Sequence, residues 1–308
     1  MTSLDPLAER ILAGDIRALA QGASLIENQT DSGRALLKLL FPHTGRAVIL
    51  GVTGPPGAGK STVASALART LRAQGQTVGI IAVDPSSPFS KGALLGDRIR
   101  MQEHHADPGV FIRSMATRGK LGGLAAASFE LALLMDAAGR DVVILETVGV
   151  GQDEIDISRM ADLTILVLVP GMGDDVQAIK AGIMEIADVF AINKADLPGA
   201  ERLEQEIRAM QSFIEQSSTP HAPIVPVIAA EGKGIDELLE TSLKVLSSRD
   251  GQSNKTDIWV HRLREMLRDK LVAAVPEPRI AAIAVEVANR QIDPFSATEL
   301  LASLVLGD

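Results

Sequence analysis

The sequence lacks cysteine altogether and is poor in aromatic residues, which make up 3% of its 308 positions. The absence of cysteine excludes disulfide bonds, thiolate metal sites and cysteine nucleophiles. Hydrophobic residues nevertheless account for 46% of the chain, so a sizeable core must be built from Ala, Val, Ile and Leu. The length suits one large domain, or a domain with substantial extensions.

Basic tracts, secretion signals and long apolar runs are also missing. The chain carries 30 basic and 39 acidic residues, a net charge of −9, which argues against nucleic acid or an anionic membrane as a partner. Residues Met1–Pro6 lack the basic stretch and apolar run of a secretion signal. The longest apolar runs are broken by charge or glycine well short of a membrane span. We therefore expect a soluble, cytoplasmic protein.

Apolar segments alternate with helical patterns through the middle of the chain. Strands that are apolar throughout and separated by helices are typical of a mostly parallel sheet covered on both faces, so we expect an α/β fold. The predicted strands are 47–53, 77–83, 110–115, 141–146, 163–169, 189–193 and 224–228. The predicted helices are 61–74, 121–138, 174–187, 200–217 and 235–247.

Helical patterns flank this central region, 46–248, at both ends. Residues 1–45 form an N-terminal helical extension whose expected helix starts are Asp5-Pro6, Asp15 and Asp31-Ser32. Ser247–Asn254 is polar and predicts a linker. The C-terminal part, 249–308, has helical patterns too short to bury their own apolar faces, so it must dock on the domain or on another subunit. Those patterns lie at 256–275, 277–290 and 294–306.

Residues 54–61 match a phosphate-binding loop, G-x-x-x-x-G-K-S. Its glycines let backbone N–H groups turn inward around phosphate oxygens, Lys60 brings a positive charge to them, and the Ser61 hydroxyl can ligate Mg²⁺. A strand-like segment precedes the loop and a helical pattern follows it, so the loop amides and the helix N-terminus both point at the anion. A glycine-rich turn without a ligand is the alternative, and this context disfavours it.

A second motif, N-K-x-D, begins at Asn193 directly after a strand-like segment. The Asp196 carboxylate can accept two hydrogen bonds from guanine, a pattern that adenine cannot supply. Asn193 can tie this loop to its neighbours, the Lys194 stem can cover the base, and residues 229–231 can complete the pocket with a backbone N–H. The four residues also fit a plain strand-to-helix loop, but their place at the carboxyl edge of the sheet favours a GTP site over an ATP site.

Carboxylates follow two other predicted strands. Mg²⁺ bound to a nucleotide takes a protein hydroxyl and carboxylates. Ser61 supplies the hydroxyl, and Asp84 and Glu146 are carboxylates at the same sheet edge, with Asp97 as a further candidate. Asp84 could instead cap the turn that follows it, and for Asp97 the two roles stay open.

Glu146-Thr147-Val148-Gly149 stands where Ras-like GTPases carry D-x-x-G. Gly149 can offer its N–H to a γ-phosphate, so Lys60, Glu146 and Gly149 are the expected catalytic residues. Val150 occupies the position of the glutamine that orients the attacking water in those enzymes. We therefore expect slow intrinsic GTP hydrolysis that a partner activates.

The motifs and four longer stretches together resemble the MeaB/ArgK-type P-loop GTPases. The resemblance runs from about Leu25 to the C-terminal helices and rests on 83–88, 92–101, 146–152 and 170–180. It implies a P-loop NTPase fold and a homodimer that escorts an adenosylcobalamin-dependent acyl-CoA mutase, foremost methylmalonyl-CoA mutase. The GTPase would gate delivery of the cobalamin cofactor and protect the mutase from inactivation.

The resemblance also implies roles for single residues. Residues 171–180 look like a third switch, with Gln177 and Lys180 as contacts to the nucleotide state or the partner, although an ordinary glycine-rich loop is the alternative. The C-terminal helices would be the dimerisation arm. The pair Ala229-Ala230 departs from the family, because the serine often found before that alanine is missing. The predicted metal ligands are Ser61, Asp84, Asp97 and Glu146. The predicted nucleotide-binding residues are Gly54, Pro55, Pro56, Gly57, Ala58, Gly59, Lys60, Ser61, Thr62, Asn193, Lys194, Asp196, Ala229, Ala230 and Glu231.

Two other functions fit a phosphate loop. A kinase or ATPase linked to amino-acid transport is disfavoured by the N-K-x-D motif. A nickel-insertion GTPase is disfavoured because the chain has no cysteine and only five histidines. The adjacent pair His104-His105 is predicted to lie on a solvated helix face.

Overall fold

The computed structural model describes residues 5–84, 101, 104, 106–116, 123–147, 160–171, 186–214, 221–249 and 251–306. For a few of these, among them Asp84, only the backbone is described. The chain divides into two compact units, Met1–Gly251 and Gln252–Asp308. In the described residues no helix is long and apolar enough to cross a membrane. The cytoplasmic location stays a prediction.

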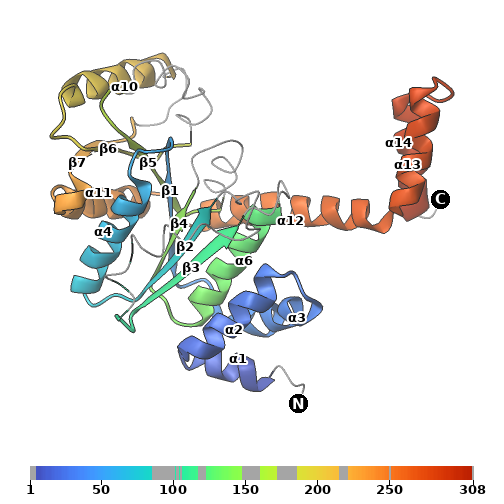
Figure 1. The fold of residues 1–308 in the computed structure, drawn as a ribbon, viewed down its shortest axis with the longest axis horizontal. Coiled ribbons are helices and arrows are strands. Elements are labelled where there is room, and N and C mark those ends of the chain that lie inside the picture. The colour runs from blue at the N-terminus through green and yellow to red at the C-terminus, as the bar shows by residue number, and fades with distance from the viewer. Residues whose placement is uncertain are drawn as a thin grey trace. The chain divides into compact units, whose positions relative to one another are not determined.

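A seven-stranded sheet forms the centre of the first unit, and all of its paired strands are parallel (Figure 1). The strand order is β3-β2-β4-β1-β5-β6-β7. The strands are β1 (Val48–Thr53), β2 (Val78–Asp84), β3 (Val110–Ala116), β4 (Val142–Glu146), β5 (Leu163–Leu168), β6 (Val189–Asn193) and β7 (Ile224–Val227). The predicted α/β fold is confirmed, and each predicted strand is present to within one residue at either end.

Helices cover both faces of this sheet, which explains why its strands are mostly apolar. Helices α4 (Lys60–Ala73) and α11 (Ile235–Ser247) pack on the face that carries Val52, Ile80 and Ile165. On the other face, α6 (Gly123–Ala137) brings Met135 against Gly79, where an added Cβ would lie 2.5 Å from the Met135 sulfur. Helix α10 (Ala200–Ile214) covers Phe190 on that second face.

The N-terminal helices are α1 (Asp5–Leu12), α2 (Ile16–Glu27) and α3 (Asp31–Leu40), followed by the short 3-10 helix η1 (Phe41–His43). They form a layer that packs on α6 through α2 and α3, while α1 packs on α2 and α3 (Figure 1). Asp15 caps α2 by accepting bonds from Arg17 N and Ala18 N, as its type predicts. Helix α6 is largely apolar on all its sides because it lies between the sheet and these helices. Its one buried carboxylate, Asp136, accepts hydrogen bonds from the backbone N–H groups of residues 45–47, directly before β1.

The second unit consists of α12 (Gly251–Ala274), α13 (Glu277–Ala288) and α14 (Pro294–Leu306). Helices α13 and α14 pack together and bury Ile283 and Ala297. The predicted linker over Ser247–Asn254 is wrong in its second half, because α12 already begins at Gly251. A polar stretch without proline costs little in a helix, and each residue added to a nucleated helix gains one hydrogen bond.

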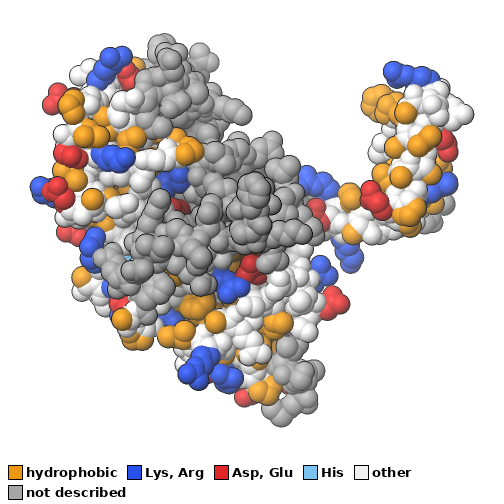
Figure 2. All heavy atoms as spheres, viewed as in Figure 1, with side chains coloured by type: hydrophobic (Ala, Val, Ile, Leu, Met, Phe, Trp, Pro, Cys, Tyr) orange, Lys and Arg blue, Asp and Glu red, His pale blue; other side chains and the backbone are white. Residues whose placement is uncertain are grey.

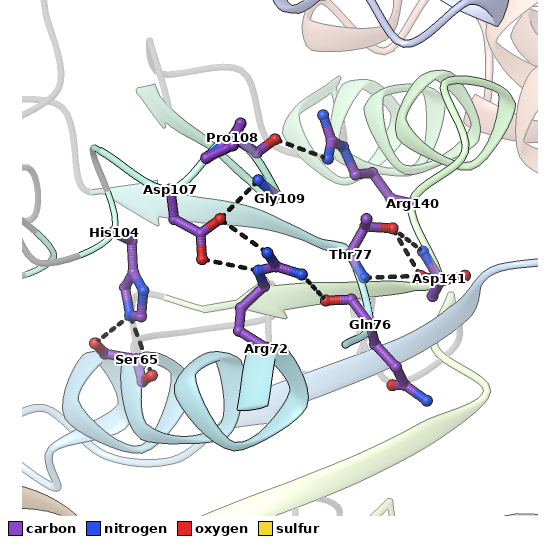
Figure 3. Close-up of polar contacts among 10 residues, drawn as sticks. All are labelled: Ser65, Arg72, Gln76, Thr77, His104, Asp107, Pro108, Gly109, Arg140 and Asp141. Carbon is purple, nitrogen blue, oxygen red and sulfur yellow. Dashed lines mark hydrogen bonds and ion pairs between the residues drawn. The ribbon is translucent and has the colours of Figure 1, made fainter. Parts of the chain in front are cut away.

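Ion pairs and side-chain-to-backbone bonds hold the amino-terminal edge of the sheet (Figure 3). The Arg72 guanidinium of α4 donates to both oxygens of Asp107, at 2.8 and 3.0 Å. Together with the Gly109 N–H, Arg72 holds the pKa of the Asp107 carboxyl below its ordinary value. Asp141 accepts from the backbone N–H of Thr77 at 2.7 Å and from its hydroxyl at 2.8 Å, and these bonds lower the pKa of Asp141.

The prediction of a solvated His104 is wrong. The residue is 6% exposed, and Nε2 lies 2.9 Å from Ser65 Oγ and 3.2 Å from the Ser65 carbonyl oxygen (Figure 3). Its backbone N–H donates to the carbonyl of Met101, which is fully buried. Two adjacent polar residues are typical of a solvent-exposed helix face, but the turn that carries His104 faces α4. There Ser65 gives the buried ring a hydrogen-bond partner. His105 lies outside the described residues.

Candidate nucleotide site

The predicted phosphate loop joins the end of β1 to the start of α4, at the carboxyl edge of the sheet. Gly54, Gly57 and Gly59 have φ angles of 143°, 78° and 87°, in the region that favours glycine. An added Cβ at Gly54 would lie 2.2 Å from the Val167 carbonyl oxygen, and one at Gly59 would lie 2.4 Å from Asn193 Nδ2. Glycine is therefore required at both ends of the loop, where it packs against β5 and β6.

Lys60 is the first residue of α4, and its side chain turns back over this loop. Its Nζ donates to the carbonyl oxygens of Gly54 at 2.9 Å and Pro55 at 3.1 Å. The residue is only 6% exposed, and these carbonyls help to offset the cost of burying an ammonium group. The positive charge is thus held at the loop that is predicted to receive phosphate.

Ser61 and Glu146, which are 85 positions apart in the sequence, meet at the mouth of the loop. Ser61 Oγ donates to Glu146 Oε1 at 2.5 Å. Glu146 is the last residue of β4 and is 5% exposed. A hydroxyl and a carboxylate are hard oxygen donors of the kind that Mg²⁺ takes, so the donor set fits the predicted metal.

Of the other two predicted metal ligands, the structure describes only the backbone of Asp84 and does not describe Asp97. Asp84 ends β2, which pairs with β4, so its backbone lies at the same sheet edge as Glu146. Asp97 lies outside the described residues. Within those residues, no three carboxylate or histidine side chains gather in a group that could hold a metal.

Asn193 connects three loops at the carboxyl end of β6. Its Nδ2 donates to the carbonyl oxygen of Ala58 at 2.9 Å, and its Oδ1 accepts from the backbone N–H of Ala229 at 3.1 Å. Its neighbour Lys194 has a φ of 55° and donates from Nζ to the carbonyl oxygen of Gly57 at 3.2 Å. The N-K-x-D motif therefore contacts the phosphate loop directly, and Asn193 makes the tie between loops that its position predicts.

The remaining base-pocket candidates surround this tie. Asp196 is exposed. Nearby, Glu231 Oε2 lies 2.7 Å from Lys233 Nζ and raises the pKa of Lys233, to which the charge of Asp196 adds a smaller contribution. Residues Ala229–Glu231 form the short helix η3, in which Ala229 is buried while Ala230 and Glu231 are exposed. The carboxylate predicted to bind guanine is thus open to solvent beside this loop.

Four predicted residues fall outside the described part of the chain, namely Asp97, Gly149, Gln177 and Lys180, and their roles stay predictions. The sequence reasoning missed two residues at this edge. Thr53 and Thr147 stand next to motif residues, and their hydroxyl oxygens lie 3.0 Å apart. Their sequence signal is a hydroxyl residue directly before the phosphate loop and another at a variable position of the segment Glu146–Gly149.

A family model described as methylmalonyl Co-A mutase-associated GTPase MeaB matches residues 19–278. The chain belongs to this family. A protein of Pyrococcus horikoshii that is named a GTPase is 43% identical over 317 aligned positions, which span 100% of both chains. The methylmalonic aciduria type A homolog of Mus musculus, named as mitochondrial, is 34% identical over 77% of this chain and 62% of its own length.

A solved structure agrees with this membership in the MeaB family. The crystal structure of a LAO/AO transport system kinase superposes with a TM-score of 0.70, with 28% identity over 99% of both chains. The resemblance to MeaB/ArgK-type GTPases is therefore confirmed, and membership of a GTPase family implies that the chain binds a guanine nucleotide.

Proposed function

We propose that this MeaB-family protein binds GTP with Mg²⁺, hydrolyses it slowly alone and faster with a partner, and serves as chaperone of a cobalamin-dependent acyl-CoA mutase. The proposal that the chain binds GTP is supported most strongly by the two hydrogen bonds of Asn193, one to the phosphate loop and one to the loop at Ala229. One side chain thereby links the predicted sites for the phosphates and the base.

Each residue of the site has a chemical task in this proposal. Lys60 and the loop N–H groups stabilise negative charge on the phosphates. Ser61, Glu146 and Asp84 would hold the Mg²⁺, with Asp97 as the further candidate, and the bound ion would neutralise charge that develops during phosphoryl transfer. Gly149 would offer its N–H to the γ-phosphate. Val150 cannot orient a water by hydrogen bonding, which is the reason to expect a slow reaction without a partner.

The mutase part of the proposal is supported by the description of the family as mutase-associated. The client we propose is methylmalonyl-CoA mutase, with delivery of adenosylcobalamin as the gated step. Gln177 and Lys180 are the proposed switch residues that report the nucleotide state to it.

We propose the C-terminal helices, 249–308, as the arm of a homodimer, attached to a GTPase domain at 46–248. Val260, Leu263, Leu267 and Leu271 recur along α12 at helical spacing and are 40%, 58%, 58% and 37% exposed. Figure 2 shows further hydrophobic side chains gathered on α13 and α14, where Phe295 is 81% exposed. Exposed apolar area of this kind supports an interface, and light scattering of the purified protein would give the mass of a dimer.

The partner is tested by size-exclusion chromatography of the chain with methylmalonyl-CoA mutase. We expect co-elution that differs between a non-hydrolysable GTP analogue and GDP. If the chain elutes separately from every acyl-CoA mutase tried in both nucleotide states, the chaperone proposal is wrong.

A kinase is the second candidate, because the solved structure of 28% identity carries a kinase name. A kinase of this fold would need to bind ATP in preference to GTP. The N-K-x-D loop, held against Gly57 and Ala58, favours guanine instead. A competition titration in which ATP displaces GTP at equal concentration would support the kinase.

A further inference from the structure

Two buried threonines meet at the carboxyl edge of the sheet. Thr53 is the last residue of β1, directly before Gly54, and Thr147 directly follows Glu146 at the end of β4. Their Oγ1 atoms lie 3.0 Å apart, and the residues are 0% and 1% exposed. A hydroxyl can both donate and accept, so each threonine satisfies the other where water does not reach.

The pair lies on the opposite face of the sheet from the Glu146 carboxylate. Strands β1 and β4 are parallel neighbours in which Val52 is aligned with Glu146, and successive side chains of a strand point to opposite faces. Glu146 points to the face of α4, where it meets Ser61. The next residues on both strands, Thr53 and Thr147, point the other way and meet each other.

A main-chain bond adds to this contact. The backbone N–H of Thr147 donates to the carbonyl oxygen of Val52 at 3.1 Å. The backbone directly after Glu146 is therefore tied to the last two residues of β1, once through the main chain and once through the hydroxyl. Threonine is branched at Cβ and stiff at χ1, so the hydroxyl contact fixes the distance between the two strand ends.

We propose that Thr53 and Thr147 are positioning residues for the metal- and phosphate-binding groups. Their bond holds the entrance of the phosphate loop against the backbone of Glu146, so that the carboxylate stays at Ser61 Oγ. The inference rests on the proposed Mg²⁺-dependent GTPase function. It adds Thr53, which directly precedes the phosphate loop, and Thr147, which fills a variable position of the segment Glu146–Gly149. The simpler alternative is a hydroxyl pair that only stabilises the fold.

Valine substitutions separate the two roles, because valine keeps the shape of threonine and removes the hydroxyl. Replacing only Thr147 leaves the Thr53 hydroxyl buried without its partner, which destabilises the fold, whereas replacing both with groups of the same shape is close to neutral. The double variant Thr53→Val/Thr147→Val therefore removes the tie and keeps the packing. Thr147→Ser keeps the hydroxyl, and Thr164→Val makes the same substitution at a buried threonine near the amino end of β5.

The experiment measures single-turnover GTP hydrolysis against Mg²⁺ concentration, GDP affinity in EDTA, and the melting temperature. For the double variant we expect a rate lower by about tenfold, equivalent to roughly 1.4 kcal/mol, and a higher half-saturating Mg²⁺ concentration. Its GDP affinity in EDTA and its melting temperature should match wild type. Thr147→Ser and Thr164→Val should keep the wild-type rate and Mg²⁺ dependence.

Two results would overturn the proposal, and they differ from each other. A double variant with the wild-type rate and Mg²⁺ dependence would show that the pair is only structural, and the proposed GTPase function would stand. A wild-type protein without any Mg²⁺-dependent GTP turnover would remove the proposed function and this inference together.

Discussion

The two edges of the sheet use similar residues for different tasks. At the amino edge, three aspartates each stand directly before a strand, namely Asp141, Asp162 and Asp188. Each accepts a hydrogen bond of 2.7 to 2.8 Å from a backbone N–H at the start of an adjacent strand or directly before it, and the donors are Thr77, Ile49 and Thr164. At the carboxyl edge, Glu146 and Asn193 each end a strand and bond to groups of the phosphate loop and helix α4.

This difference follows from the direction of parallel strands. The amino edge presents backbone N–H groups, and a carboxylate before a strand is well placed to accept from them. The carboxyl edge carries the loops on which ligands collect in such sheets. A polar residue directly before a strand therefore stabilises the sheet, whereas one directly after a strand can serve the ligand site. The substitutions below change residues at one edge or the other.

The largest effect is expected at the carboxyl edge, from Lys60→Ala. Loss of the ammonium removes charge stabilisation of the phosphates, and GTP turnover should fall at least about a hundredfold. The circular dichroism spectrum should stay that of the folded protein. Turnover close to wild type in a folded variant would contradict the assignment of the phosphate loop.

Asp196→Asn should alter nucleotide choice with little effect on folding. An amide cannot accept two hydrogen bonds from guanine, so the preference for GTP over ATP should fall by about ten- to a hundredfold, given roughly 1.5–3 kcal/mol for bonds to a charged group. Competition titrations of both nucleotides give this ratio. An unchanged ratio would show that the exposed carboxylate does not read the base.

Asp188→Ala provides the matching test at the amino edge. The carboxylate accepts from Thr164 N at 2.7 Å and also pairs with Arg249. Its loss should lower the free energy of unfolding by about 1–3 kcal/mol, while the GTP-to-ATP preference stays at its wild-type value. Urea unfolding measures the free energy of unfolding. A changed GTP-to-ATP preference would contradict the claim that residues at the amino edge serve stability alone.

A smaller effect concerns pH and Asp107. Arg72 and the Gly109 N–H lower its pKa from the ordinary value of 3.8, so its contribution to stability is present above that value and is lost as pH falls through the lowered pKa. Urea midpoints at pH 6 and pH 3 should differ less in Asp107→Asn than in wild type. Identical pH dependence of the two proteins would show that ionised Asp107 does not contribute to stability.

The sequence was sufficient to predict the strands because each strand is mostly apolar and is bounded by turn residues. It also predicted Asn193 as a tie between loops, because the order of motifs along a parallel sheet places them at one edge. It could not show the Thr53–Thr147 bond, which depends on the register of β1 against β4. His104 was misread because its burial depends on a serine 39 positions away.

Partner stimulation is the central claim, and the most direct test is the GTP turnover rate of the purified protein with and without methylmalonyl-CoA mutase at one Mg²⁺ concentration. Val150 offers no group to orient the attacking water, so we expect slow turnover alone and a rise of at least about tenfold with the mutase. A rate that is already fast alone, or that is unchanged by saturating mutase, would contradict the account.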